Sequence, residues 1–386
     1  MRFEDIKIDR LEIAQSDLDI ENRVRTNLFA WNGQFSPQFV EALLNKYAVA
    51  GDTVIDPFLG SGTTIYECAR KGLSAIGVEL NASAYHISKI YELCNLPRAE
   101  RFEIIDQIDK LLADTQDIQV LSKRATTDKN TLRCNVLMAL IVLLDIYYNE
   151  PDQDFILKKW EKLKQTIMEL PYSAQPISVL LGDSNSVAFP PDSIDLLITS
   201  PPYINVFNYH QKYRRSVELL GYKVLNIARG EIGSNRKNRG NRLLTVIQYC
   251  IDMAISLQTA SQTCRPNARM IYVVGRESNV LGYSFCNSEL IYRIGTEILG
   301  LNLITRQERV FKNRYGQMIF EDILHFANTK TSINLSEEVI IDAARKIAVD
   351  ALKKKQCDYP NSENVGYIQN AIDKATSVKR SEANYE

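Results

Sequence analysis

The chain has 386 residues and a hydrophobic content of 45%, which suits one large α/β domain with insertions or two domains. Its formal net charge of -1 excludes a whole-molecule attraction to nucleic acid, so a surface that binds phosphates has to be a local patch. The seven cysteines form no C-x-x-C pair, the first residues are charged, and no apolar run approaches the roughly 20 residues that a bilayer requires. We therefore predict a soluble cytoplasmic protein with reduced thiols, no metal and no membrane partner.

The first predicted element is an amphipathic helix that begins near residue 37. Ser36 is a suitable N-cap residue, and Pro37 suits the first helical position, where its missing N–H would have no partner anyway. Apolar side chains then recur at intervals of three and four residues up to Leu44. The pattern predicts a helix that packs on its neighbours directly before the first strand.

The stretch from Thr53 to Thr64 reads T-V-I-D-P-F-L-G-S-G-T-T, which predicts a strand, a glycine loop and the start of a helix. In a parallel sheet this unit places free N–H groups and the positive end of the helix dipole at the carboxyl end of the strand, where nucleotide-like ligands bind. No lysine follows Gly62 and the third glycine of a dinucleotide site is missing, so neither common phosphate-binding motif fits. The next strand ends at Glu79, about 20 residues further on, where a carboxylate can accept hydrogen bonds from ribose hydroxyls.

The α/β pattern stops over residues 97–176. Apolar residues keep helical spacing there, and the run from Val136 to Leu144 is apolar nearly all round, so it has to be covered on every side. We predict a helical insertion. It is either a scaffold or oligomer contact, or one wall of a nucleic-acid cleft.

Two further strands bring polar groups to the same edge of the sheet. The first ends just before Asp183, which is suited to accept a hydrogen bond from an adenine amino group, and the second leads into T-S-P-P-Y. The prolines remove two N–H donors, which leaves the carbonyls of Ser200 and Pro201 as acceptors in a rigid turn. Such carbonyls can hold an exocyclic amino group, and Tyr203 offers a face for a base that has left the stack.

The segment 204–242 carries nine Lys or Arg residues against two Glu residues, a local balance of +7. Its position directly after the proline turn predicts a mobile basic loop that orders on duplex DNA, and a solvated basic loop is the alternative. The residues expected to contact nucleic acid are Lys212, Arg214, Arg215, Arg236, Lys237, Arg239 and Arg242. Beyond this loop we predict a helix from Leu243, a buried strand at 268–274, a closing strand pair at 301–311 and 318–328, and a helical tail.

The motif D-P-F-L-G-S-G-T-T, together with Glu79, Asp183 and S-P-P-Y, resembles the DNA methyltransferases that modify exocyclic amino groups. The resemblance covers residues 27–95 and 177–330 and implies an α/β fold of the class I S-adenosylmethionine-dependent methyltransferase type. That fold is a Rossmann-like, doubly wound, seven-stranded sheet with a terminal antiparallel hairpin, here joined by a helical insertion. The expected organisation is 1–96 with the cofactor loop, 97–176 as the insertion, 177–330 as the catalytic part with the basic loop, and 331–386 as a helical tail.

The resemblance also implies roles for individual residues. The cofactor would be S-adenosyl-L-methionine, held by Phe35, Ser36, Asp56, Pro57, Phe58, Gly60, Ser61, Gly62, Thr63, Glu79 and Asp183. Catalysis and target-base binding would belong to Ser200, Pro201, Pro202 and Tyr203. The serine at the head of S-P-P-Y resembles the cytosine-N4 branch more than the adenine branch. In contrast to many relatives, the cofactor loop here precedes the catalytic turn, which leaves open where the target-recognition segment lies.

The predicted function is therefore site-specific methylation of the N4 amino group of cytosine in double-stranded DNA. A restriction-modification context follows from this function, with a cognate restriction endonuclease as the candidate partner. Two alternatives stand beside it, namely the same chemistry on adenine N6 or an RNA base, and a non-catalytic nucleic-acid-binding module of the same fold. The sequence predicts no particular oligomeric state.

Overall fold

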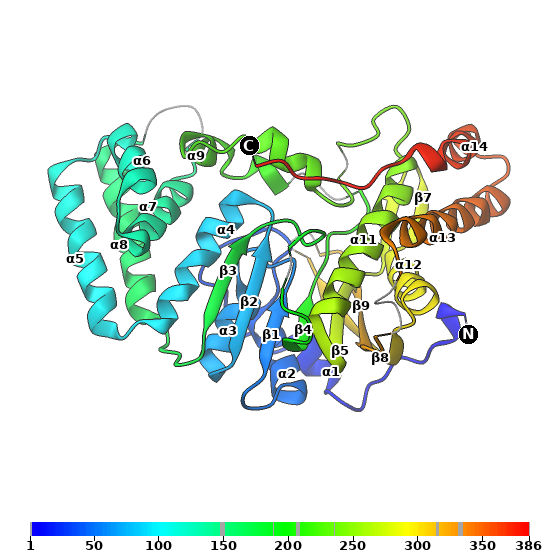
Figure 1. Ribbon diagram of the computed structural model, residues 1–386, viewed down its shortest axis with the longest axis horizontal. Helices are drawn as coiled ribbons and strands as arrows, with labels where there is room; N and C mark the ends of the chain where they lie inside the picture. The colour runs from blue at the N-terminus through cyan, green and yellow to red at the C-terminus, as the bar shows by residue number, and fades with distance from the viewer. Residues whose placement is uncertain are drawn as a thin grey trace.

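A central β-sheet organises the molecule (Figure 1). The computed structural model describes residues 2–146, 151–187, 189–205, 209–234, 236–313, 316–330 and 335–385. The strands in this part of the chain are β1 (Thr53–Asp56), β2 (Ser74–Glu79), β3 (Ile177–Leu181), β4 (Ile194–Thr199), β5 (Cys264–Gly275), β6 (Glu277–Val280), β7 (Tyr283–Cys286), β8 (Asn302–Lys312) and β9 (Met318–Ala327). Seven of them form one sheet in the order β3-β2-β1-β4-β5-β9-β8, and β6 pairs with β7 in a separate hairpin.

The sheet is doubly wound. Strands β1 to β5 run parallel, whereas β9 is antiparallel to both β5 and β8. The chain builds outward from β1 through β2 to β3, and then returns to the other side of β1 for β4 and β5. The strand order therefore reverses between β1 and β4, and such a reversal opens a crevice at the carboxyl ends of the strands. The predicted fold class, with its terminal antiparallel pair, is confirmed.

Helices lie on both faces of the sheet, beside β3 and along the carboxyl edge of the strands (Figure 1). They are α1 (Gln15–Asp19), α2 (Pro37–Tyr47), α3 (Thr63–Lys71), α4 (Ala82–Ser88), α5 (Arg98–Asp114), α6 (Ile118–Thr127), α7 (Thr131–Leu143), α8 (Gln153–Glu169), α9 (Arg214–Leu219), α10 (Val224–Ile227), α11 (Leu244–Thr263), α12 (Asn287–Arg293), α13 (Glu337–Asp358) and α14 (Val365–Asp373). None of the helices that the structure describes is both long enough and apolar enough to cross a bilayer.

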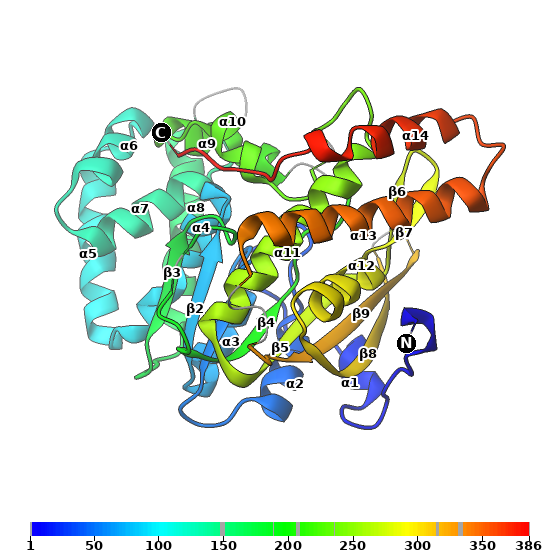
Figure 2. The same cartoon turned by 45° about the vertical axis from the view of Figure 1, so that its right-hand side comes forward.

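Two apolar cores form because strand side chains alternate between the faces of the sheet. In β4, Leu196 and Ile198 join the core that contains α2 and α3, and Leu197 joins the core that contains α11 and α13. The helices α11, α12 and α13 lie over one face of β4, β5 and β9 (Figure 2). Both faces of the central strands are thus covered, which leaves their carboxyl ends as the accessible part.

Helices α5 to α8 fill residues 98–169 and stand beside β3 at one end of the sheet (Figure 1). Helix α7 is the one that is apolar nearly all round, and it packs against α4, α5, α6, α8 and α9. Its buried side chains belong to the same core as those of α2 and α3. The insertion therefore extends the main core beyond the edge strand.

Two local predictions need correction. Ser36 does precede helix α2, but its hydroxyl makes no cap hydrogen bond. The expected basic loop is not a bare loop, because α9, α10 and two short 3-10 turns at Tyr209–Gln211 and Ala228–Gly230 lie within the described parts of 204–242. Val217 of α9 and Val224 and Ile227 of α10 are buried, which explains why this segment folds onto the protein, whereas Leu225 is exposed.

The predicted helical tail is also only partly right. Helices α13 and α14 are present, but residues 378–385 are extended and run back across the carboxyl edge of the sheet to the vicinity of α9 (Figures 1 and 2). The hairpin formed by β6 and β7 was not predicted either. Its eight residues alternate in burial over only two short strands, a signal too brief to recognise from sequence.

Substituting Gly62 tests the glycine loop that starts helix α3. Gly62 has φ +91°, and a Cβ there would lie 2.7 Å from the Tyr91 ring. We expect Gly62→Ala to lower the free energy of unfolding by about 2–4 kcal/mol, because it combines backbone strain with overpacking. Urea denaturation measures this change. Gly366→Ala is the matched control, since a Cβ at Gly366 meets nothing within 4 Å, and equal losses in both variants would contradict the packing argument.

Candidate active site

An open cavity of about 1000 Å³ lies at the carboxyl ends of β1, β2 and β4. The predicted residues that line it come from both motifs, and they are Phe35, Ser36, Asp56, Pro57, Phe58, Gly60, Thr63, Glu79, Asp183, Ser200, Pro201, Pro202 and Tyr203. Ser61 and Gly62 do not line it. These two loop residues contact other parts of the protein instead. The Ser61 hydroxyl donates to Gln34 Oε1 at 2.6 Å, and Gly62 packs against the Tyr91 ring. The two motifs therefore open into one space.

Asp56 joins the two motifs. Its carboxylate is buried at the end of β1 and accepts hydrogen bonds from the hydroxyls of Thr64 and Thr199, each at 2.6 Å, and from the Phe58 N–H at 3.1 Å. Thr199 is the last residue of β4 and directly precedes Ser200. Burial raises the pKa of Asp56 to about 6, and the two threonine hydroxyls oppose this rise by stabilising the charged form. The glycine loop and the proline turn thus share one anchor.

Glu79 fixes the glycine loop from the neighbouring strand. One carboxylate oxygen accepts from the Gly60 N–H at 2.6 Å, and the other accepts from the Asn81 N–H at 2.7 Å. Burial raises the pKa of Glu79 to about 7, and the backbone donors partly oppose that shift. Each oxygen of a carboxylate has a second lone pair, so Glu79 can still accept hydrogen bonds from a ligand in the cavity.

The extended segment 378–385 lies beside Asp183, although its residues are not among those that line the cavity. Burial raises the pKa of Asp183, whereas the Asn185 N–H at 2.9 Å and the nearby Arg380 guanidinium stabilise the carboxylate. The segment is anchored at Ser381, whose N–H donates to buried Asp252 at 2.7 Å. Further along, the Tyr385 hydroxyl lies 3.5 Å from a backbone carbonyl oxygen of the residue after Glu79. Sequence reasoning missed this segment, because an extended stretch with mixed polarity has no periodic signal.

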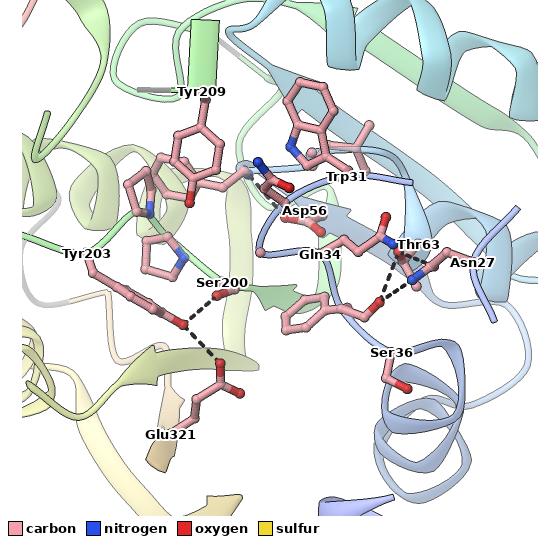
Figure 3. Close-up of a pocket in the computed structure, with 18 of the residues that line it drawn as sticks. Asn27, Trp31, Gln34, Ser36, Asp56, Thr63, Ser200, Tyr203, Tyr209 and Glu321 are labelled. Carbon is pink, nitrogen blue, oxygen red and sulfur yellow. Dashed lines mark hydrogen bonds between the residues drawn. The ribbon is translucent and has the colours of Figure 1, made fainter. Parts of the chain in front are cut away.

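One wall of the cavity comes from the residues before helix α2. The Asn27 side-chain amide donates to the Phe35 carbonyl at 2.7 Å, and the Thr63 hydroxyl donates to Asn27 Oδ1 at 2.8 Å (Figure 3). The Ser36 Oγ is buried, and no partner for it is found among the described residues. Asn27 and Gln34 line the cavity but were not predicted. The residues next to them in the sequence form no recognisable motif, so their position in the cavity is evident only from the fold.

The proline turn holds a short chain of polar groups. The Ser200 and Tyr203 hydroxyls are 3.4 Å apart, and the Tyr203 hydroxyl donates to Glu321 Oε1 at 3.2 Å (Figure 3). Glu321 belongs to β9 and lines the cavity, although no sequence motif contained it. It lies 118 residues from Tyr203 along the chain, so only the sheet brings the two together.

None of the seven basic residues predicted to contact nucleic acid lines the cavity, and several have partners within the protein. Lys212 donates to the Ala30 carbonyl at 2.7 Å and lies over the rings of Trp31 and Tyr213. Three others are held by side chains of the protein. These pairs are Arg214 with Glu218, Lys237 with Ser381, and Arg242 with Asn205. Arg215 and Arg239 are exposed and Arg236 is half-buried.

Parts of the chain are similar in sequence to known DNA methyltransferases. Residues 14–90 match the N6/N4 methyltransferase family described as DNA methylase. The type II methyltransferase M.MjaII of Methanocaldococcus jannaschii is 31% identical over 100 residues, which cover 26% of this chain and 16% of that protein. The type II methyltransferase M.BsoBI of Geobacillus stearothermophilus is 23% identical, with 57% of this chain and 58% of that protein covered. A solved SAM-dependent methyltransferase of Methanosarcina mazei covers 74% of this chain at 10% identity, with a TM-score of 0.36 and 96% of that protein covered.

The doubly wound sheet and the cavity at its switch point define an α/β protein with a nucleotide-type ligand site. The family match over residues 14–90 and the similarity to the type II relatives support the DNA N4/N6 methyltransferase family for this chain. The matched residues 14–90 include the glycine loop, and the S-P-P-Y turn lies beyond them. The chain spans between 16% and 58% of the length of these two relatives.

The pH dependence of stability tests the burial of Asp56. A carboxyl group whose pKa is raised in the folded state stabilises the fold fully below its unfolded pKa of 3.8, and this contribution is lost as the pH rises through about 6. We expect Asp56→Asn to gain about 3 kcal/mol of unfolding free energy relative to wild type between pH 4 and pH 7. Urea denaturation across this range measures the difference.

Thr199→Val provides the comparison. Its lost hydroxyl no longer stabilises the Asp56 carboxylate, so the pH window in which wild-type stability falls should move upward in this variant. Parallel stability curves for wild type and Asp56→Asn would show that Asp56 is not the group that titrates.

Proposed function

We propose that this protein transfers a methyl group from S-adenosylmethionine to the exocyclic N4 amino group of cytosine in DNA. The observation that carries the proposal is the shared cavity, in which the glycine loop and the S-P-P-Y turn are joined through the Asp56–Thr199 hydrogen bond. A methyl transfer requires donor and acceptor to meet in line within one space, and this cavity offers that space.

The cavity fits the methyl donor by its chemistry. S-adenosylmethionine contributes a ribose, an adenine, an amino acid and a reactive methyl group on a sulfonium sulfur. Glu79 retains acceptor capacity for the ribose hydroxyls, and Asp183 can accept from the adenine amino group. The Ser36 hydroxyl, for which the described part of the chain provides no partner, suits the amino-acid end. The cofactor-binding residues that we propose are Phe35, Ser36, Asp56, Pro57, Phe58, Gly60, Ser61, Gly62, Thr63, Glu79 and Asp183.

The proline turn would hold the base amine. The carbonyls of Ser200 and Pro201 can accept its two N–H bonds, which keeps the nitrogen lone pair out of the ring and directed at the methyl carbon. Pro202 makes the turn rigid by fixing φ. Tyr203 closes the corner of the pocket in which a base taken out of the stack would lie. The serine at the head of this turn is the feature that favours cytosine over adenine.

DNA is the proposed substrate because the family and the named relatives are DNA methylases and type II methyltransferases. That designation of the relatives also supports a restriction-modification context with a cognate endonuclease. The basic residues that we propose for phosphate contacts are Lys212, Arg214, Arg215, Arg236, Lys237, Arg239 and Arg242.

Nucleoside mass spectrometry tests the reaction. DNA from cells that express the protein should contain N4-methylcytosine, and expression of Ser200→Ala or Pro202→Ala should abolish it, because each variant alters the turn that holds the amine. Ser377→Ala and Pro360→Ala are matched controls at exposed positions and should leave the product unchanged. Methyladenine as the product would move the target to the adenine amine, and a modified base found only in RNA would replace DNA as the substrate.

A further inference from the structure

The cavity contains a carboxylate that belongs to neither motif. We propose that Glu321 is the final acceptor of the proton that the base amine has to lose, and that the hydroxyls of Ser200 and Tyr203 conduct this proton to it. This inference rests on the proposed methyl transfer and adds the residues that complete it.

The geometry forms a continuous path from the turn to β9. Ser200 Oγ lies 3.4 Å from Tyr203 Oη, and Tyr203 Oη lies 3.2 Å from Glu321 Oε1 (Figure 3). Arg309 donates to the other Glu321 oxygen at 3.1 Å. All four side chains line the same cavity. The path thus begins at the residue proposed to touch the amine and ends on a carboxylate paired with a cation.

The hydrogen bond to Glu321 is not needed to place the Tyr203 ring. The ring packs against the backbone of Gly275, where a Cβ would lie 2.5 Å from its edge. The Tyr203 carbonyl is held equally closely by Gly233, where a Cβ would lie 2.3 Å from the oxygen. Because packing already fixes the residue on two sides, a carboxylate aimed at its hydroxyl points to a role in proton movement.

The presence of Arg309 makes a carboxylate tolerable at this place. The Glu321 side chain is only 13% exposed, and an unpaired charge buried to that degree is costly. Arg309 is itself 8% exposed and stacks on the rings of Phe39 and Phe311, so its position is fixed by packing. Glu321 is therefore a charge-paired carboxylate beside the S-P-P-Y turn, at a place where burying a neutral side chain would cost less free energy.

The proton balance follows from the transfer itself. The amine nitrogen forms a bond to the methyl carbon, the bond from that carbon to sulfur breaks, and its electron pair stays on sulfur. The nitrogen now carries a positive charge and two protons. One stays on the nitrogen, and the other, held until then by the Ser200 carbonyl, moves to Oγ of the same residue. Ser200 passes its own hydroxyl proton to Tyr203 Oη, and Tyr203 passes its proton to Glu321. Since the lone pair of the product amine is delocalised into the ring, the charged form is a strong acid, and a carboxylate paired with arginine is a sufficient base.

Single-turnover methylation of unmodified genomic DNA tests this path. Glu321→Gln keeps the shape and an acceptor oxygen but removes the basic carboxylate, and Tyr203→Phe interrupts the path. We expect each variant to slow the transfer about 100-fold, in the range of general acid-base catalysis, and the double variant to be no slower than either. The affinity for S-adenosylmethionine, measured by calorimetry, should stay within about 3-fold, because Glu321 acts after binding. Glu297→Gln, at an exposed ion pair with Arg293, is the control and should match wild type.

Chemical rescue separates a proton acceptor from a structural carboxylate. In Glu321→Ala, added formate or acetate should restore at least a tenth of the lost rate, with acetate the better of the two because it is the stronger base, whereas chloride should not. Glu321→Gln with a wild-type rate, or equal rescue by chloride, would overturn the proposal. Failure of the proposed function is a different result, namely that wild type transfers no methyl group to DNA while it still binds S-adenosylmethionine.

Discussion

The Asp56 carboxylate is the contact on which the candidate site depends. Parallel pairing of β1 with β4 aligns Val54 with Leu196 and Ile55 with Leu197, so both strands end at the same level. The turn that follows β4 contains two prolines and therefore cannot be held through their backbone N–H groups. A side-chain anchor is needed, and the Thr199 hydroxyl supplies it by donating to Asp56. Because the same carboxylate holds Thr64 at the start of α3, the two motifs keep a fixed separation.

The sheet also explains why the order of the motifs along the chain does not affect the site. In a doubly wound sheet, the carboxyl ends of all parallel strands open on one edge, whichever strand comes first. The helical insertion does not affect the site either. It connects β2 to β3, and β3 is an edge strand, so α5 to α8 can extend away from the sheet without covering the cavity. A large insertion and an early cofactor loop are therefore compatible with one shared pocket.

The parts of the site that sequence predicts are those encoded by local chemistry. Glycines at a strand end, an acidic residue at the end of the next strand and paired prolines after a third strand can each be interpreted within a few residues, and Asp56, Glu79 and Ser200 are predicted in this way. Glu321 and the 378–385 segment are not, because their roles arise from pairings across more than 100 residues. The charge count of 204–242 likewise could not reveal that Lys212 and Arg214 have protein partners, since this depends on the folding of α9.

Two of the carboxylates that line the cavity are costly to bury in their charged form. Burial raises the pKa of both Asp56 and Glu79, which means that their charged forms are incompletely compensated in the folded chain. Glu79 already accepts two backbone N–H bonds, and ribose hydroxyls would add further donors to the same oxygens. A ligand that donates to Glu79 therefore stabilises its ionised form, and by linkage the ionised form binds that ligand more tightly. The incompletely compensated charge at this edge thus favours a ligand that donates hydrogen bonds through hydroxyl groups, which a phosphate group, itself an anion, could not do.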